Sequence, residues 1–239
     1  MKKQIVILSI LLLTFALNAQ VLKSIQIKAD YSMPLSKRIN VENIDAVGGM
    51  IKVNFNLYEN LSVSLSGGYK LYSISQTNQL FGWGWNFWNE RYYNKIVSDL
   101  QADPNLSVEI GSVQKMDVIP AVLTFNYDFN ILQNFTATPI IGGGVYFYTK
   151  RLYAKETWTK QYPAENYSFT YSFRNFAPDK QGNPFILMGG LDLNYFITDG
   201  FGIEGGILYS QILSSDKMGF SEFPFENEIS FKLGLTINY

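Results

Sequence analysis

The segment SFKLGLTINY (residues 230–239) ends the chain in strict two-residue alternation. Its odd-numbered residues are apolar, and its even-numbered residues are polar or glycine. Successive side chains of a β-strand point to opposite faces of the sheet, so this pattern predicts a strand with one apolar face. The two faces are Phe231, Leu233, Leu235, Ile237 and Tyr239 against Ser230, Lys232, Gly234, Thr236 and Asn238.

The same alternation recurs in seven earlier stretches, which gives eight predicted strands. Short and long connections alternate between them, as they do in up-and-down barrels that cross a membrane. The sequence therefore predicts an all-β fold, an eight-stranded antiparallel up-and-down transmembrane β-barrel with short periplasmic turns and long extracellular loops. The earlier strands are expected at 25–31, 47–57, 61–69, 119–127, 139–147, 185–195 and 201–209, and the long loops at 34–44, 76–114, 151–182 and 214–224.

Two alternatives to this barrel are a β-sandwich and a soluble lipocalin-like barrel. A sandwich does not need one set of loops kept short, so the alternating connections disfavour it. The charges on the polar stripes argue against the soluble barrel. A membrane barrel turns its apolar stripe toward lipid, whereas a soluble barrel turns it inward. Eight charges facing lipid would cost several kcal/mol each at mid-depth, but four cations and four anions can pair across a narrow lumen. This predicted lumen charge network consists of Lys28, Asp30, Lys52, Lys70, Asp192, Glu204, Glu228 and Lys232.

Aromatic residues gather near both ends of the predicted strands, as in the two interfacial girdles of membrane barrels. A soluble barrel has no physical reason to place rings in two such belts. The belt near the short turns is Tyr58, Tyr127, Phe129, Phe135, Tyr195, Phe201 and Tyr239, and the belt near the long loops is Tyr31, Tyr69, Phe147 and Tyr209.

The composition excludes several functional classes. The 239 residues include 19 Lys+Arg and 20 Asp+Glu, so the chain lacks the basic excess of nucleic-acid-binding proteins. It has no His and no Cys, and therefore neither the commonest general base nor thiolate chemistry. Ser64, Ser66 and Lys70 share one stripe, where lumen polarity is the simpler explanation than catalysis. We expect no enzyme activity, no catalytic or metal site, no cofactor and no nucleic-acid partner.

The first residues predict export. Lys2 and Lys3 precede an apolar run over residues 5–17, which is too short for a membrane-spanning helix of about 20 residues. A basic start, a short apolar core and a small residue at the exit are typical of a secretory signal peptide. We expect a signal peptide at 1–19, cleaved after Ala19, and a barrel domain at 20–239. The predicted location is the cell outer membrane.

The last strand also carries a candidate insertion signal. Its spacing of a polar residue, Gly, an apolar residue and a C-terminal aromatic residue resembles the C-terminal β-signal recognised by the outer-membrane insertion machinery. An exposed final strand is a template for strand addition, which is the physical role expected here. The matching residues are Lys232, Gly234, Ile237 and Tyr239.

Three segments carry a family resemblance. Residues 118–127 contain an internal Ile-Pro pair, residues 141–146 read Ile-Gly-Gly-Gly-Val-Tyr, and residues 188–193 read Met-Gly-Gly-Leu-Asp-Leu. With the glycine-containing last strand, the chain resembles the eight-stranded outer-membrane β-barrel domain family of Bacteroidota, which includes PorT-like proteins. The resemblance to OmpA-like and OmpX-like barrels is looser and concerns shape. It implies an outer-membrane location and a non-catalytic barrel, without one fixed function.

The predicted long loops hold two aromatic clusters. Residues 89–100 have apolar positions at helical spacing, and residues 167–173 alternate as a hairpin strand after a turn at 163–166. Exposed loop aromatics mark recognition sites, whereas the alternative is that they pack on one another or on the barrel mouth. The candidate interaction residues are Trp83, Trp85, Trp88, Tyr92, Tyr93, Trp158, Tyr167, Phe169, Tyr171 and Phe173.

The sequence thus favours a non-enzymatic outer-membrane protein that serves envelope structure and surface interaction through these loops. An eight-stranded barrel is filled by its own side chains, so the lumen is expected to be plugged. Two alternatives stay open, a transport channel for small solutes or hydrophobic compounds and an accessory subunit of a secretion or assembly complex. The expected partners are outer-membrane lipid, the barrel-insertion machinery, and a surface ligand or envelope protein.

Overall fold

The computed structural model describes residues 22–38, 41–76, 78–213 and 222–239. Eight antiparallel strands form a closed ring in the order β1-β2-β3-β4-β6-β9-β10-β11, with β11 pairing β1. The predicted signal peptide lies outside the described residues. The elements are β1 (Leu22–Lys37), β2 (Val41–Tyr58), β3 (Leu61–Gln76), α2 (Gln79–Gly82), η1 (Phe87–Tyr92), α3 (Tyr93–Ala102), β4 (Leu106–Tyr127), β5 (Phe129–Leu132), β6 (Phe135–Tyr162), η2 (Pro163–Glu165), β7 (Tyr167–Phe176), β8 (Lys180–Gly182), β9 (Phe185–Thr198), β10 (Phe201–Ile212) and β11 (Phe225–Asn238).

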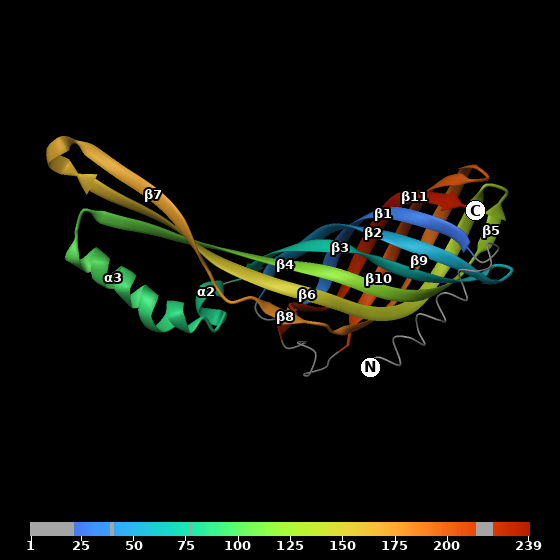
Figure 1. Ribbon diagram of the computed structural model, residues 1–239, viewed down its shortest axis with the longest axis horizontal. Coiled ribbons are helices and arrows are strands. Elements are labelled where there is room, and N and C mark those ends of the chain that lie inside the picture. Colours follow the sequence, from blue (N-terminus) through green and yellow to red (C-terminus); the bar gives the residue numbers. More distant parts are fainter. Residues whose placement is uncertain (1–21, 39–40, 77, 214–221) are drawn as a thin grey trace.

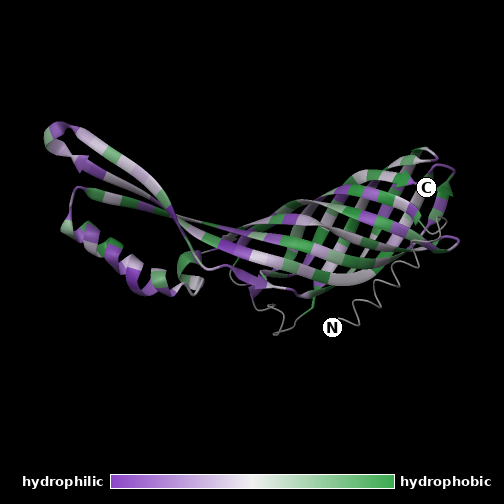
Figure 2. Ribbon diagram, in the orientation of Figure 1, coloured by the Kyte–Doolittle hydropathy of each residue, from purple (hydrophilic) through white to green (hydrophobic). Residues whose placement is uncertain are grey.

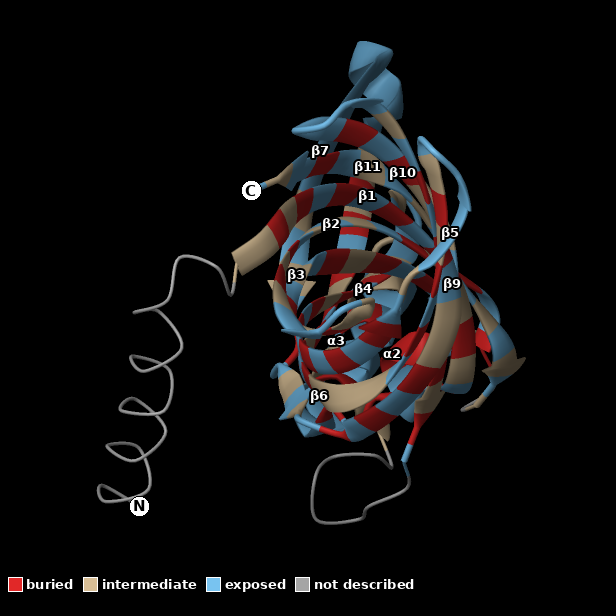
Figure 3. Cartoon of the chain, turned by 90° about the vertical axis from the view of Figure 1, so that its right-hand side faces the viewer, coloured by how far each residue is buried: buried red, intermediate tan, exposed pale blue. Residues whose placement is uncertain are grey.

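The ring turns its apolar residues outward and its polar residues inward. Ile141 and Leu233 are each 69% exposed, whereas Lys28 and Glu204 are 3% and 2% exposed. Hydropathy and burial both alternate along the ring strands (Figures 2 and 3). This arrangement excludes both the sandwich and the soluble barrel, because each of those folds buries its apolar face. The predicted eight-stranded up-and-down barrel is confirmed.

The tight turns lie at one end of the ring, where the prediction placed them. The β2–β3 turn is at Glu59 and Asn60, and the β9–β10 turn is at Asp199 and Gly200. The connection at 128–133 contains the short strand β5, which folds back on the start of β6. Figure 1 shows β5 and the C-terminus together at this end of the barrel.

Three of the four predicted long loops are shorter than expected. β1 runs to Lys37 and β2 starts at Val41, so most of the predicted loop 34–44 is strand. β4 starts at Leu106 and β6 continues to Tyr162, so residues 106–114 of loop 76–114 and most of loop 151–182 are paired strand, and the rest of the first loop contains α2, η1 and α3. Residues 106–114 and 152–160 pair with one another beyond the ring, whereas the extended ends of β1 and β2 pair with β11 and β3. Most of the loop predicted at 214–224 lies outside the described residues.

Beyond the ring, β4, β6 and β7 form a three-stranded extension that carries a helical segment on one face (Figure 1). We call the arm residues 78–117 together with 151–177, which include α2, η1, α3, β7 and the outer parts of β4 and β6. The predicted helix at 89–100 corresponds to η1 and α3, and the predicted hairpin strand corresponds to β7. Among the described residues, no helix is long and apolar enough to cross a bilayer.

Candidate functional site

The lumen near the short-turn end holds one ion-pair cluster. Lys28 lies 2.7 Å from Asp192 and also pairs with Glu204, and Lys52 lies 3.2 Å from Asp192. Thr236 donates a 3.1 Å hydrogen bond to Glu204. Gly206 leaves the space that Asp192 occupies, because a Cβ at this glycine would overlap the carboxylate. These buried charges are compensated by neighbours drawn from different strands.

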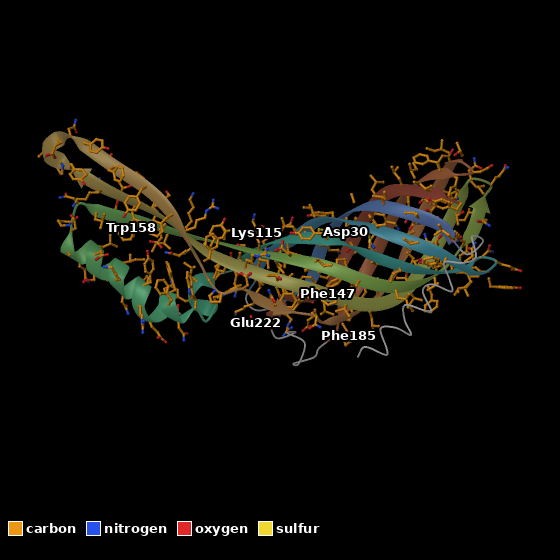
Figure 4. The ribbon with its side chains drawn as sticks, viewed as in Figure 1. Asp30, Lys115, Phe147, Trp158, Phe185 and Glu222 are labelled. Carbon is orange, nitrogen blue, oxygen red and sulfur yellow. The ribbon has the colours of Figure 1, made fainter. Side chains whose placement is uncertain are left out.

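A second cluster lies nearer the long-loop end. The Lys70 ammonium lies 3.1 Å from Glu228 and 3.3 Å from Asp30. Tyr72 and Tyr146 each donate a 2.6 Å hydrogen bond to Glu228, so two hydroxyls and one ammonium satisfy this fully buried carboxylate. Asp30 lies in the wall of the barrel (Figure 4).

The predicted network therefore divides into two clusters that include seven of its eight members. Lys232 faces Asp30 across the β1–β11 ladder. Within the described part of the chain, no carboxylate forms an ion pair with Lys232. The proximity of the seven others follows from closure of the ring, which brings residues up to 176 positions apart in the sequence into contact.

An apolar cluster closes the lumen toward the long loops, and sequence analysis missed it. Phe223 and Phe225 are fully buried with ring centroids 4.7 Å apart, and Tyr148 and Tyr72 pack against them at 5.2 and 5.4 Å. The cluster contains inward side chains from every ring strand except β1, so it spans the lumen. At the opposite end the lumen keeps a polar cavity of about 30 Å³, enough for one or two water molecules.

A loss of alternation signals this cluster. At the outer ends of the strands the inward positions become apolar as well, as at Met116, Val118, Ile186 and Ile212. Phe223 lies in a segment that the sequence predicted as loop. At the long-loop end of a strand, apolar residues at consecutive positions follow the stretch whose inward positions are charged. This change in the pattern could have predicted the cluster.

The arm has its own core, formed mainly by the four tryptophans. Trp83, Trp85, Trp88 and Trp158 are 5%, 7%, 1% and 6% exposed. Trp85 and Trp88 stack with centroids 5.6 Å apart, and Leu152 packs in the same cluster. These rings pack on one another between the helices and the sheet, so most of their surface is withdrawn from solvent. Figure 4 shows Trp158 on the side of the arm that faces the helix.

A buried carboxylate organises this core. Glu156 is fully buried and accepts hydrogen bonds from Trp158 Nε1 at 2.8 Å, Asn175 Nδ2 at 2.6 Å and the Tyr92 hydroxyl at 3.1 Å. Partial burial and the nearby Glu156 carboxylate raise the pKa of Tyr92 above its usual value, so Tyr92 stays protonated and donates. Sequence analysis did not single out Glu156. Its signal is one acidic residue on an otherwise apolar stripe with Leu152 and Ala154.

An electrostatic anchor ties the arm to the barrel mouth. Glu222 lies 3.2 Å from Lys150 and 3.0 Å from Lys180, and both ammonium groups lie over the Trp83 ring at 5.1 and 4.9 Å. Burial alone would raise the pKa of the Glu222 carboxyl, but the Lys180 hydrogen bond and the Lys150 charge hold it below its usual value. Figure 4 shows Glu222 at the junction between ring and arm.

An open groove of about 430 Å³ runs between α3 and the aromatic face of the arm. Tyr171 and Phe173 stack nearly parallel, with an interplanar angle of 14° and centroids 6.1 Å apart. Lys95 pairs with Asp99 on α3, and Lys160 pairs with Asp103, whose pKa this hydrogen bond lowers. The lining consists of Tyr92, Lys95, Ile96, Asp99, Ala102, Asp103, Leu106, Trp158, Tyr171 and Phe173.

Four of the six remaining candidate aromatics are exposed, whereas Tyr92 and Phe173 are partly buried against the tryptophan core. Tyr93 is 38% exposed on α3, Tyr167 and Phe169 are 58% and 48% exposed on β7, and Tyr171 is 44% exposed. The structure thus divides the ten predicted interaction residues into a packed core of four tryptophans and six outer rings. The groove is lined by Trp158 from the core and by three of the outer rings, Tyr92, Tyr171 and Phe173. Among the described residues, no group of three or more acidic side chains is arranged to hold a metal ion.

The predicted insertion signal lies on β11, the strand that closes the ring. Lys232 and Gly234 lie on its inner stripe, whereas Ile237 and Tyr239 point outward and are 41% and 71% exposed. The Tyr239 amide donates to the Lys23 carbonyl on β1 at 3.0 Å. Recognition of this segment by the insertion machinery stays a prediction.

Comparison with known proteins gives matches to solved structures only. No protein-family model matches the chain, and no curated protein matches its sequence, so the Bacteroidota resemblance stays a prediction. Neisserial surface protein A matches with 10% identity over 90% of this chain and 96% of its own, at a TM-score of 0.46. OprG of Pseudomonas aeruginosa matches with 11% identity over 92% and 97%, at 0.44. Ail of Yersinia pestis matches with 12% identity over 92% and 99%, at 0.41.

Proposed function

We propose that this protein is a non-enzymatic outer-membrane barrel that recognises a ligand outside the cell through its arm. The observation that carries the proposal is a contrast within one chain. The lumen is filled by charge clusters and an apolar cluster, whereas the arm presents an open groove of about 430 Å³. A filled barrel has no path for a solute. We therefore assign ligand recognition to the arm.

The outward face of the ring supports a membrane position. From Ile119 to Tyr127, β4 presents only apolar outward side chains over nine residues, close to the about 9–11 residues that a tilted strand needs to cross a bilayer. The next outward residue is Asp117, which pairs with Arg151 on β6. Tyr69, beside this ion pair, is 48% exposed in the outer aromatic belt. The first charged side chains on the outward face of β4 and β6 therefore lie at the depth expected for the lipid headgroups.

Cysteine labelling tests the membrane topology directly, because the chain contains no Cys. Ser168→Cys places a thiol at the exposed tip of the arm, and Asp199→Cys places one in an exposed tight turn. In intact cells, a membrane-impermeant maleimide is expected to label Ser168→Cys alone. Asp199→Cys should react only after the outer membrane is permeabilised. Labelling of Asp199→Cys in intact cells would reverse the proposed orientation.

Planar-bilayer conductance separates surface recognition from transport. The apolar cluster around Phe223 and Phe225 blocks the lumen, so the reconstituted protein is expected to give no reproducible channel steps above the leak of the lipid alone. The detergent-solubilised, heat-denatured protein is the control for lipid damage. Reproducible steps from folded protein only would move the function to transport.

A further inference from the structure

The groove of the arm combines flat aromatic rings with charges of both signs. We propose that it binds a linear, uncharged polysaccharide whose sugar rings stack on Tyr171 and Phe173. This inference rests on the proposed function, because it assigns a ligand class to the same arm. Three features of the groove support this ligand class: its aromatic row, its charged rim and the hydrogen bonds that fix its lining.

The aromatic floor matches the shape of a sugar chain. Tyr171 and Phe173 lie nearly parallel, and Phe169 continues the row with a centroid 5.8 Å from that of Tyr171 and a ring tilted by 33°. Phe169 and Tyr171 are 48% and 44% exposed, so a ligand can contact both rings without rearrangement. Pyranose rings have flat C–H faces that pack on aromatic rings. Since the row continues beyond the groove, a chain of several sugars fits better than one ring.

The rim of the groove selects against charged and purely apolar ligands. Lys95, Asp99 and Asp103 line the groove. Lys95 pairs with Asp99, and Asp103 pairs with Lys160 just outside the lining, so these four charges sum to zero. An acyl chain would cover these groups and remove their hydration without replacing it, which costs free energy. The hydroxyl groups of a sugar donate to the carboxylates and accept from the ammonium groups, while its C–H face contacts the rings.

The groove is also held in shape before any ligand arrives. Glu156 accepts hydrogen bonds from Tyr92 and from Trp158, which both line the groove. These bonds fix two lining side chains from beneath, so little conformational entropy remains to be lost on binding. Glu156 thus acts as a positioning residue under the aromatic floor.

The test is a titration of the purified full chain in detergent with cellohexaose, maltohexaose and chitohexaose. Tryptophan fluorescence reports binding, because Trp158 lines the groove. At least one hexasaccharide is expected to give a saturable change. Tyr171→Ala should weaken its affinity about tenfold or more, as the loss of a central aromatic contact does at binding sites. Phe176→Ala is the matched control, because it removes an exposed ring from the opposite face of β7 and should leave the affinity unchanged.

Three results would overturn the proposal. The first is no response to any of the three sugars, and the second is an equal loss of affinity in Tyr171→Ala and Phe176→Ala. The third is saturation by phosphatidylcholine vesicles or by an uncharged hexapeptide in place of the sugars. Labelling of Ser168→Cys in intact cells is independent of these titrations. A wrong ligand class is therefore distinguishable from a wrong location of the arm.

Discussion

Replacing Lys28 with Met is expected to lower the free energy of unfolding by about 3–5 kcal/mol, the usual cost of removing one partner from a buried ion pair. The Lys28 ammonium pairs with both Asp192 and Glu204, and the side chains of all three residues are at most 4% exposed. Methionine fills a similar volume but leaves Glu204 without a cation. The measurement is urea unfolding in lipid vesicles, followed by the gel mobility difference between folded and unfolded barrel.

Two further variants make this expectation specific to the buried charge. Lys23→Met removes a cation that pairs with Asp128 at the rim of the lumen, where the side chains are 26% and 18% exposed, so about 1 kcal/mol or less is expected. Lys28→Met combined with Glu204→Gln should recover much of the loss, because Asp192 keeps Lys52 as a partner. Equal losses in Lys28→Met and Lys23→Met would contradict a buried lumen network.

The ring could be predicted from sequence because the alternation of apolar and polar residues is visible within each single strand. A strand with lipid on one side and a polar lumen on the other alternates at every step, as residues 230–239 show. The same rule placed Lys28, Lys52 and Lys70 inside before any pairing was known. The choice of ion-pair partner was not predictable, because it depends on how the ring closes.

The helix and the hairpin strand of the arm were predicted, but the extension of β4 and β6 into the arm and the apolar cluster at the barrel mouth were not, because they depend on contacts between distant segments. Beyond the ring, β4 and β6 are covered by helices on one face, so strand signals there looked like loop sequence. The type of an aromatic residue does not tell whether its side chain is packed or exposed. Only the structure shows that Trp88 is buried and that Tyr171 is accessible. Glu156 was missed because its three donors come from β6, β7 and η1.

Trp88→Ala is expected to unfold the arm while the ring stays folded. Trp88 is 1% exposed and packs against Trp85 and Tyr92, and truncating a fully buried Trp costs about 3–5 kcal/mol. The arm core shares no residue with the cluster that closes the barrel mouth. Limited proteolysis should therefore cut the variant within residues 87–102, while its gel mobility still shows a folded barrel.

Two neighbouring substitutions separate packing from other effects. Phe87→Ala removes the adjacent ring, which is 49% exposed, so it should cost much less and leave α3 resistant to protease. Trp88→Phe should be intermediate, because the Trp88 indole N–H has no hydrogen-bond partner in the described part of the chain and only packing is lost. Simultaneous loss of the arm and the ring in Trp88→Ala would mean that both fold as one unit. Selective loss of the arm, together with loss of hexasaccharide binding, would place recognition in a module that folds on the outer ends of β4 and β6.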